Sequence, residues 1–273
     1  MNTKKILLLI AIILVVVGGI LAAVAWGLGA STSITWNRGF RAAQPSNVRY
    51  ELNETFSPFT RVELSIGVSN NVTLRAGDDY RIEGHHYGEI TYEVRGNTLY
   101  VDTPSQTRRQ FSIFSGWNSL TQGGNVIITV PWETTLYDSN LTLGVGNLRI
   151  DNVAFNNAVV TSGVGDINTQ STDFQNVTIT AGVGNIDAAG LFSGRADITN
   201  GVGDTTLEIA GPQDRFSYTI EGGVGSITIN GERQGGALGN TLTNTAADPL
   251  GTLRIEAGVG SVRIDFLERQ TRG

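Results

Sequence analysis

The sequence predicts an all-β protein, a single-stack β-solenoid or β-helix with coils of roughly 19 residues. Three observations support this: the tripeptide Gly-Val-Gly recurs, apolar and polar residues alternate beside each copy, and 35 glycines accompany only 16% charged residues. The spacing is the strongest of the three, because the first four copies are separated by three equal intervals of 19 residues. The first glycines of the copies are Gly144, Gly163, Gly182, Gly201, Gly223 and Gly258.

The residues that flank the first four copies repeat as well. Before the motif an apolar residue is followed by threonine, in the pairs Leu141-Thr142, Val160-Thr161, Ile179-Thr180 and Ile198-Thr199. After the motif, Asn and Asp alternate from copy to copy and precede Leu, Ile or Thr, in the pairs Asn147-Leu148, Asp166-Ile167, Asn185-Ile186 and Asp204-Thr205. Two copies also share an aromatic column, Phe155 and Phe174.

Each unit therefore reads as a strand, a glycine bend, a second strand and a turn. A unit this short cannot bury its apolar face alone, so neighbouring coils must stack at about 4.8 Å. The period of two predicts that the Thr and Asn/Asp columns lie near the surface or a turn. It also predicts a buried valine column, made of Val145, Val164, Val183 and Val202.

Ahead of these copies, residues 62–74 resemble a degenerate unit in which Ser69 replaces the second glycine. Its Gly67 precedes Gly144 by 77 residues, close to four units. Between them, residues 80–84, 90–102 and 125–131 have the composition of strands, and 103–124 that of a long loop.

Two later units keep the order of strand, motif and strand, at 220–229 and 253–266. The longer interval between them equals one unit plus 16 residues, which predicts a flexible polar insertion within 231–250.

The N-terminus carries an uncharged run from Ile6 to Leu28, whose 23 residues would reach roughly 34 Å as a helix and cross a hydrocarbon core of about 30 Å. Lys4 and Lys5 precede it, which predicts a single-pass membrane protein with a cytoplasmic N-terminus and an extracytoplasmic C-terminal domain. The alternative is a secreted protein, because Ala23-Val24-Ala25 fits a signal-peptide cleavage site. The predicted organisation is a membrane anchor or signal peptide at 1–30, a stalk at 31–55, a β-strand-repeat solenoid at 56–267 and a tail at 268–273.

The composition limits the partners. Cysteine is absent, so disulfides and thiolate metal sites are excluded. The 19 basic residues include two lysines, so 17 arginines face 25 acidic residues. This acidic balance argues against nucleic acid and anionic lipid headgroups, which require basic surfaces. The expected partners are the membrane, through the N-terminal helix, and a cell-wall polymer or an envelope protein.

A Gly-Val-Gly-Asn/Asp repeat preceded by GNTLYVD (96–102) and VIITVP (126–131) resembles a bacterial β-strand-repeat family grouped as adhesins of unknown function. The resemblance covers about residues 56–267. It implies a β-solenoid exposed at the cell envelope, in some cases near envelope-stress genes, and it implies no catalytic residues.

Few residues qualify for chemistry. His85 and His86 are adjacent in a polar turn and are expected in a surface loop rather than in a metal site. Asp166 and Asp204 lie two coils apart, roughly 9.6 Å, close to the separation of an inverting glycosidase, but the ladder of equivalent residues explains them as well. Calcium binding by the same column is a second alternative to the ladder, and it is disfavoured because only two of the six copies carry Asp.

Nucleophile and phosphate-loop motifs are absent from the sequence. Arg254 and Arg263 flank the last motif, where they could bind an anionic polymer. The sequence thus predicts no catalytic, cofactor-binding or metal-binding residue and no cofactor. It predicts a non-enzymatic, membrane-anchored envelope protein that presents a binding or adhesion surface. The alternatives are a carbohydrate-active β-helix enzyme and an accessory protein of an envelope-stress response.

Overall fold

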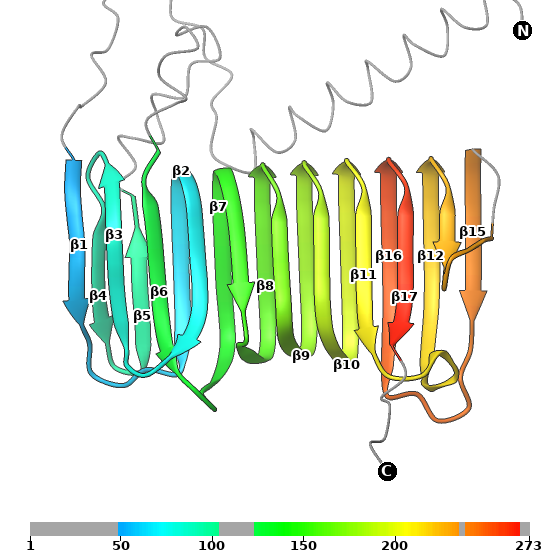
Figure 1. The fold of residues 1–273 in the computed structure, drawn as a ribbon, viewed down its shortest axis with the longest axis horizontal. Coiled ribbons are helices and arrows are strands. Elements are labelled where there is room, and N and C mark those ends of the chain that lie inside the picture. The colour runs from blue at the N-terminus through cyan, green and yellow to red at the C-terminus, as the bar shows by residue number, and fades with distance from the viewer. Residues whose placement is uncertain (1–48, 104–122, 235–237, 268–273) are drawn as a thin grey trace, which may run out of the picture. The chain divides into compact units, whose positions relative to one another are not determined.

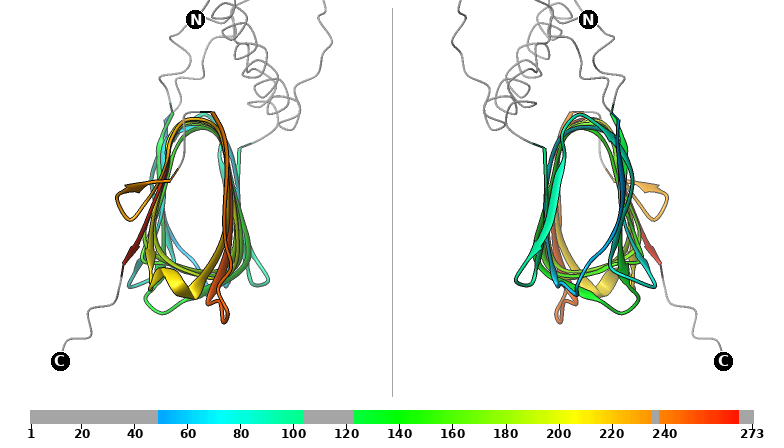
Figure 2. Two further views of the ribbon diagram at one scale, coloured as in Figure 1. Left: turned by 90° about the vertical axis from the view of Figure 1, so that its right-hand side faces the viewer. Right: turned by 90° about the vertical axis from the view of Figure 1, so that its left-hand side faces the viewer.

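The computed structural model describes residues 49–103, 123–234 and 238–267. These residues wind into a flattened tube whose coils stand side by side (Figure 1), and the end-on view is an oval ring with two long walls (Figure 2). The all-β solenoid is therefore confirmed. The predicted membrane helix lies outside the described residues, and within them no helix is long and apolar enough to span a membrane.

The first wall runs along the tube from β1 to β14. Its strands, in the order in which they pair, are β1 (Arg49–Thr55), β3 (Arg81–Tyr87), β6 (Asn125–Pro131), the second half of β2 (Arg61–Gly77), the end of β7 (Thr135–Asp151), the beginnings of β9 (Ile167–Val183) and β10 (Ile186–Val202), β11 (Thr205–Ala210), β17 (Val262–Leu267), β13 (Ile227–Ile229) and β14 (Glu232–Arg233).

The second wall runs from β4 to β15. Its strands, in pairing order, are β4 (Thr91–Arg95), β5 (Thr98–Asp102), the first half of β2, the first part of β7, β8 (Ala154–Val164), the ends of β9 and β10, β16 (Gly251–Val259), β12 (Phe216–Val224) and β15 (Leu238–Asn244). A 3₁₀ turn, Gln213–Arg215, precedes β12.

Two narrow edges join the walls. The edge made by the Gly-Val-Gly motifs is called here the glycine rim, and strands β2 and β7 pass over it. Strands β9 and β10 pass over the opposite edge. The predicted strands at 80–84, 90–102 and 125–131 are confirmed as β3 to β6. The predicted loop at 103–124 lies almost wholly outside the described residues. The last seven residues of the predicted stalk form β1.

The core follows the predicted apolar columns. The residues before the motif, Leu141, Val160, Ile179 and Ile198, are buried, as are those that begin the next strand, Leu148, Ile167, Ile186 and Thr205. The aromatic column has a third member, because Phe192 continues the stack of Phe155 and Phe174 with ring centroids 5.5 and 5.4 Å apart. Burial of such columns in every coil supplies the apolar contact that a single coil lacks.

The coils do not stack in chain order, and this corrects the sequence-based view of the later units. The C-terminal coil, β16 and β17, lies between the coil of β10 and β11 and the coil of β12 and β13 (Figure 1). Phe266 of this coil packs against Phe216 and Tyr218, at 5.4 and 6.0 Å between ring centroids. Strand pairing depends on matching columns rather than on sequence distance, so a late copy can enter between two earlier ones.

Strand pairing also corrects two further expectations, the position of the degenerate copy and the flexibility of the insertion within 231–250. The degenerate copy does not lie four coils from Gly144, because Val68 and Val145 are direct partners in the β2–β7 ladder. Between these two strands, the described residues form β3 to β6 at the N-terminal end of the tube. The predicted flexible insertion within 231–250 contains β15, which closes the other end by antiparallel pairing with β12.

Candidate functional site

The glycine rim explains the Gly-Val-Gly motif. A β-carbon at Gly184 would lie 2.2 Å from the carbonyl oxygen of Gly165, and at Gly203 it would lie 1.9 Å from that of Gly184. Both residues also have positive φ, 142° and 140°. Only glycine combines this backbone conformation with this closeness of neighbouring coils, so the motif is required by the bend.

The valine between the two glycines is not buried, which corrects the predicted inner column. Val164 is 41% exposed, and the equivalent residues Val145, Val183 and Val202 are partly exposed. A strict period of two would bring Val145 inside after Leu141 and Leu143. The bend at the glycines ends that alternation, and the valines form a ladder on the outside of the rim.

The Asn/Asp column beside the rim joins one coil to the next. The side-chain oxygen of Asn147 accepts the backbone N–H of Asp166 at 3.1 Å, and Asp166 accepts that of Asn185 at 2.8 Å. Asn185 likewise accepts the N–H of Asp204 at 3.0 Å, and Asp204 accepts that of Ser261 at 2.8 Å. These bonds account for both carboxylates that the sequence offers as a glycosidase pair. The described residues contain no cluster of three or more His, Cys, Asp and Glu side chains suited to a metal.

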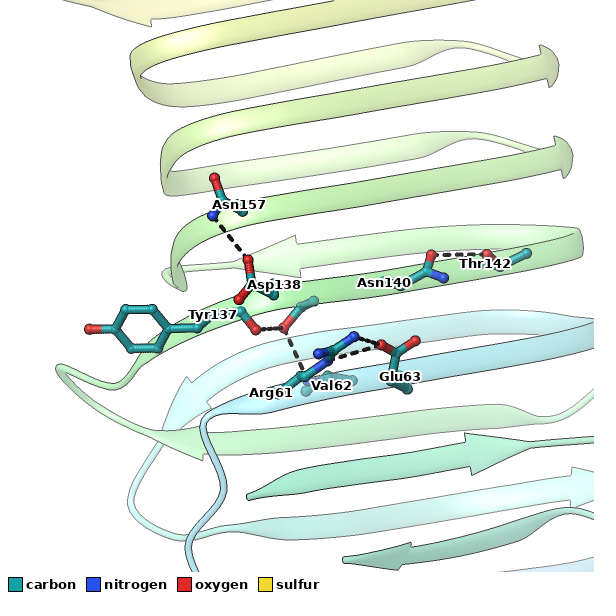
Figure 3. Close-up of polar contacts among 9 residues, drawn as sticks. Arg61, Val62, Glu63, Tyr137, Asp138, Asn140, Thr142 and Asn157 are labelled. Carbon is teal, nitrogen blue, oxygen red and sulfur yellow. Dashed lines mark hydrogen bonds and ion pairs between the residues drawn. The ribbon is translucent and has the colours of Figure 1, made fainter. Parts of the chain in front are cut away.

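A second ladder follows the opposite edge. Asn157 donates to the carboxylate of Asp138 at 3.0 Å (Figure 3), and Asn176 donates to Asn157 at 3.1 Å. All three have positive φ, between 47° and 67°, a conformation that Asn and Asp adopt more readily than most residues. This ladder therefore joins neighbouring coils and also supplies the residues with positive φ near this edge.

The two histidines lie on strand β3 rather than in a surface loop, which corrects the sequence prediction. As expected for neighbours on a strand, they do not share a site, since His85 packs edge-on against Tyr87 while His86 is 1% exposed. The two ring nitrogens of His86 lie 3.1 Å from the carbonyl oxygen of Gly88 and 2.9 Å from that of Val68. His86 thus ties β3 to the degenerate end of the glycine rim.

Many of the described arginines on the outer surface share one pattern, an ion pair with an acidic residue two positions along the strand. Arg61 binds Glu63 in this way (Figure 3), and this hydrogen bond raises the pKa of Arg61 above its ordinary value. The same pattern recurs in the pairs Arg49–Glu51, Arg149–Asp151, Arg195–Asp197 and Arg254–Glu256.

Arg263 departs from that pattern. It forms no ion pair with any residue that the structure describes, although Asp265 stands two positions further on. Arg254 is on strand β16 of the second wall and Arg263 on β17 of the first. The structure therefore does not bring these two arginines together.

Arg263 lies in a groove of about 550 Å³ on the outer face of the first wall, called here the C-terminal groove. The groove crosses β11, β17 and β13, three strands that the insertion of the C-terminal coil makes neighbours. It combines one guanidinium with carboxylates and hydroxyls, and its lining is Asp204, Thr206, Glu208, Ser226, Thr228, Ser261, Val262, Arg263 and Asp265.

A smaller groove of about 390 Å³ lies on the second wall over β4, β5, β2 and β7. Its charged groups are already engaged, because Glu63 binds Arg61 and Glu93 binds Arg95 at 2.9 Å. The guanidinium of Arg95 also lies 4.8 Å from the ring centroid of Tyr100 and covers the one aromatic side chain in the lining. The C-terminal groove is therefore the better candidate for a binding site.

The family follows from a match over most of the chain. The model of the family described as Toastrack DUF4097 matches residues 60–265. The chain belongs to the Toastrack family. This confirms the resemblance inferred from the repeats and from the strands that precede them. The Toastrack match begins within one residue of β2 and ends inside β17.

Two solved structures resemble this Toastrack chain. A "putative cell adhesion protein" from Clostridium sporogenes is 20% identical, with a TM-score of 0.48 over 81% of this chain and 100% of that one. A "putative adhesin" from Bacteroides fragilis is 19% identical, with a TM-score of 0.43 over 81% of this chain and 98% of that one. No curated protein matches the chain.

Sequence reasoning did not find the C-terminal groove. Asp204, Ser226 and Ser261 occupy equivalent places after three glycine motifs, which the sequence alone could have revealed. Their order in space could not be inferred, because it depends on the insertion of the last coil.

Proposed function

We propose that this protein is a membrane-tethered, extracytoplasmic and non-enzymatic solenoid that binds a neutral wall polysaccharide in the C-terminal groove. The uncharged run Ile6–Leu28 with Lys4 and Lys5 before it supports the tether and its orientation. With a cleaved signal peptide, the same solenoid would be secreted and its binding chemistry unchanged.

The observation that carries the proposal is Arg263. Arg263 forms no ion pair with a described residue, so the N–H groups of its guanidinium are available to donate to a ligand. The guanidinium groups of Arg61 and Arg254 instead bind the carboxylates of Glu63 and Glu256. Hydroxyls extend the surface beside it, from Thr206 on β11, from Thr228 on β13, and from Ser226 and Ser261, which directly precede β13 and β17.

The charge of the groove indicates the kind of ligand. One guanidinium and three carboxylates, those of Asp204, Glu208 and Asp265, give a formal charge of −2. This charge repels a polyanion, so the anionic polymer considered from the sequence is not favoured. Sugar hydroxyls both donate and accept hydrogen bonds, which suits a lining of acceptors, donors and hydroxyls.

A hydrolytic role has less support. Asp166 and Asp204 each hold the backbone N–H of the next coil, at 2.8 Å in both cases. A general acid or base must reach the bond that is cleaved. These two carboxylates instead accept backbone N–H groups within the ladder. The binding role therefore requires no catalytic residue.

The experiment measures the binding of full-length protein in detergent to purified wall polysaccharide and to isolated walls. Arg263→Ala is expected to weaken binding roughly 10-fold or more, since hydrogen bonds to a charged group contribute about 1.5–3 kcal/mol. Arg254→Ala is the matched control, because this arginine is paired with Glu256 and lies on the other wall, and we expect unchanged affinity. Equal losses in the two variants, or no binding by the unaltered protein, would refute the assignment.

The topology has its own test. Intact cells are treated with external protease and probed with an antibody against the C-terminal repeats. Loss of the repeats with retention in the membrane fraction is expected, whereas recovery in the medium would support the secreted form. Full protection of the chain would refute the outward orientation.

A further inference from the structure

The outer side of the glycine rim carries an unbroken row of valines, called here the valine ladder. The rim is the upper edge of the tube in Figure 1, and each valine pairs with the next at about 4.8 Å from coil to coil. All of them are at least partly exposed. A single exposed valine needs no explanation, but a contiguous apolar row on a protein surface marks a site of contact. In their order along the tube, the members are Val68, Val145, Val164, Val183, Val202, Val259 and Val224.

The chain leaves the described part of the tube, and returns to it, beside the first member of this ladder. The hydroxyl oxygen of Thr103 accepts the backbone N–H of Gly67 at 2.9 Å. Where the description resumes, the carbonyl oxygen of Gly124 accepts the hydroxyl of Ser69 at 2.6 Å. Val68 is the residue between Gly67 and Ser69, so the ends of the intervening segment are held on either side of it.

That segment is longer than the bend at the rim requires. Strands β5 and β6 pair with the two halves of β2, so they are the two strands of one coil. Strand β2 crosses the rim within residues 66–70, whereas the chain takes residues 103–124 to pass from β5 to β6. Residues 104–122 are therefore not needed to close the coil and are available for another contact.

The composition of residues 104–122 is complementary to the ladder and its border. Their sequence, PSQTRRQFSIFSGWNSLTQ, contains two arginines and no acidic residue. The exposed carboxylates of Asp166 and Asp204 follow two of the ladder valines on the rim, so the charge of the segment is opposite to that of the border. The segment also supplies large apolar side chains, namely Phe111, Ile113, Phe114, Trp117 and Leu120.

We propose that residues 104–122 pack along the valine ladder of their own chain, with the stretch 111–117 against the valines from Val145 to Val202. The reach is sufficient. Four coil spacings separate Val68 from Val202, which is about 19 Å. Trp117 precedes Gly123 by six residues, and an extended chain of that length spans about 20 Å.

Two physical arguments favour this occupant over a separate molecule. The segment is held at both ends beside Val68, so its effective concentration at the ladder is set by a short linker rather than by diffusion. An anionic lipid surface fits less well, because the carboxylates of Asp166 and Asp204 would face its phosphate groups.

Trypsin treatment of the full-length protein, in membranes from broken cells, tests the contact. Trypsin cleaves after Arg108 and Arg109 once these residues leave the ladder, and mass spectrometry identifies the cut. In the ladder variant, Val164→Asn with Val202→Asn, cleavage there is expected to be roughly tenfold faster or more, because two apolar contacts are lost and proteolysis follows the population of the open form.

The matched control introduces the same residue three positions earlier in the same two strands, Thr161→Asn with Thr199→Asn. These threonines lie on the outer face of the second wall, so cleavage at the unaltered rate is expected. Arg149 and Arg195, on β7 and β10, report on the tube itself, because trypsin reaches them only when those strands open.

A segment variant, Phe114→Ser with Trp117→Ser, changes the other side of the contact and no described residue. It is expected to be cleaved as fast as the ladder variant, and the two variants combined are expected to be cleaved no faster than either alone, because both remove one interaction. Rates that multiply in the combination would assign the segment to a membrane or a partner protein and overturn the proposal.

Three other results would also overturn it. These are unchanged cleavage in the ladder variant, a control as fast as the ladder variant, and rapid cleavage of the unaltered protein. If the ladder variant is also cut after Arg149 or Arg195, the segment variant decides, and cleavage of that variant at the unaltered rate would refute the contact.

Discussion

Replacement of Gly184 by alanine tests the physical account of the glycine rim. A β-carbon there would lie 2.2 Å from the carbonyl oxygen and 2.6 Å from the carbonyl carbon of Gly165, where ordinary contacts begin at 3.4 Å. The coils cannot separate easily, because the N–H of Gly184 donates to Val202 at 2.9 Å and that of Gly165 donates to Val183 at 2.8 Å. The backbone must therefore distort.

Two costs add at this position. A residue with a side chain at φ 142° is strained by about 1–3 kcal/mol, and forced overpacking costs about another 1–3 kcal/mol. The free energy of unfolding should fall by about 2–6 kcal/mol. For a domain of this size each kcal/mol lowers Tm by roughly 2–4 °C, so a fall of at least about 4 °C is expected in a thermal unfolding scan.

Gly96→Ala separates the two costs. Gly96 also has positive φ, 59°, but no atom lies within 4 Å of the position of its β-carbon. Only the backbone cost applies, about 1–2 kcal/mol. A Gly184→Ala variant that unfolds at the same temperature as Gly96→Ala would show that close approach of the coils does not constrain the rim, and the reasoning above would be refuted.

Three further predictions concern the ladders, the C-terminal coil and the buried histidine. Asp166→Asn should keep Tm within about 1 °C, because the amide oxygen still accepts the N–H of Asn185. Asp166→Ala should lower the free energy of unfolding by about 0.5–1.5 kcal/mol, and equal stability of the two variants would contradict the ladder. Deletion of 251–273 removes the coil between β10 and β12, so we expect binding of a hydrophobic dye and rapid proteolysis, and a protease-resistant product would argue against its structural role. His86→Ala should lower the free energy of unfolding by about 1–3 kcal/mol, more than His85→Ala, because a buried ring is lost and a carbonyl oxygen beside it loses the ring N–H that it can accept; denaturant titration that ranks the variants the other way would contradict this.

The repeat made the architecture predictable because every element carries the same local signal. The alternation of apolar and polar residues placed Leu141 and Ile179 in the core correctly, and the strands between 80 and 131 have the expected composition. The alternation failed at Val145, where the glycine bend turns the chain around a narrow edge. A periodicity argument assumes that the strand stays straight, and at Gly144–Gly146 it does not.

The order of the coils could not be predicted. Copies at Gly223 and Gly258 have similar columns, and local sequence does not determine which of them pairs with β10. In the structure Gly258 lies next to Gly201, so the copy at Gly258 is the one that pairs with β10. The same coil also packs Phe266 against Phe216. The candidate groove could not be predicted for the same reason, because β11, β17 and β13 become neighbours only when the C-terminal coil enters between the two earlier coils. His86 was misjudged because the polar residues around it are typical of a turn.

The position of the last coil has a consequence for biosynthesis. Asp204 accepts the backbone N–H of Ser261 across 57 residues of sequence, so this bond cannot form until residue 261 has been synthesised. A solenoid stacked in chain order could consolidate coil by coil behind the ribosome. Here the strands β10 and β12 must wait for the C-terminus, and long-range closure of this kind slows folding. A prematurely terminated chain would leave the edges of β10 and β12 without the strand that pairs with both, a state that proteases can recognise and degrade.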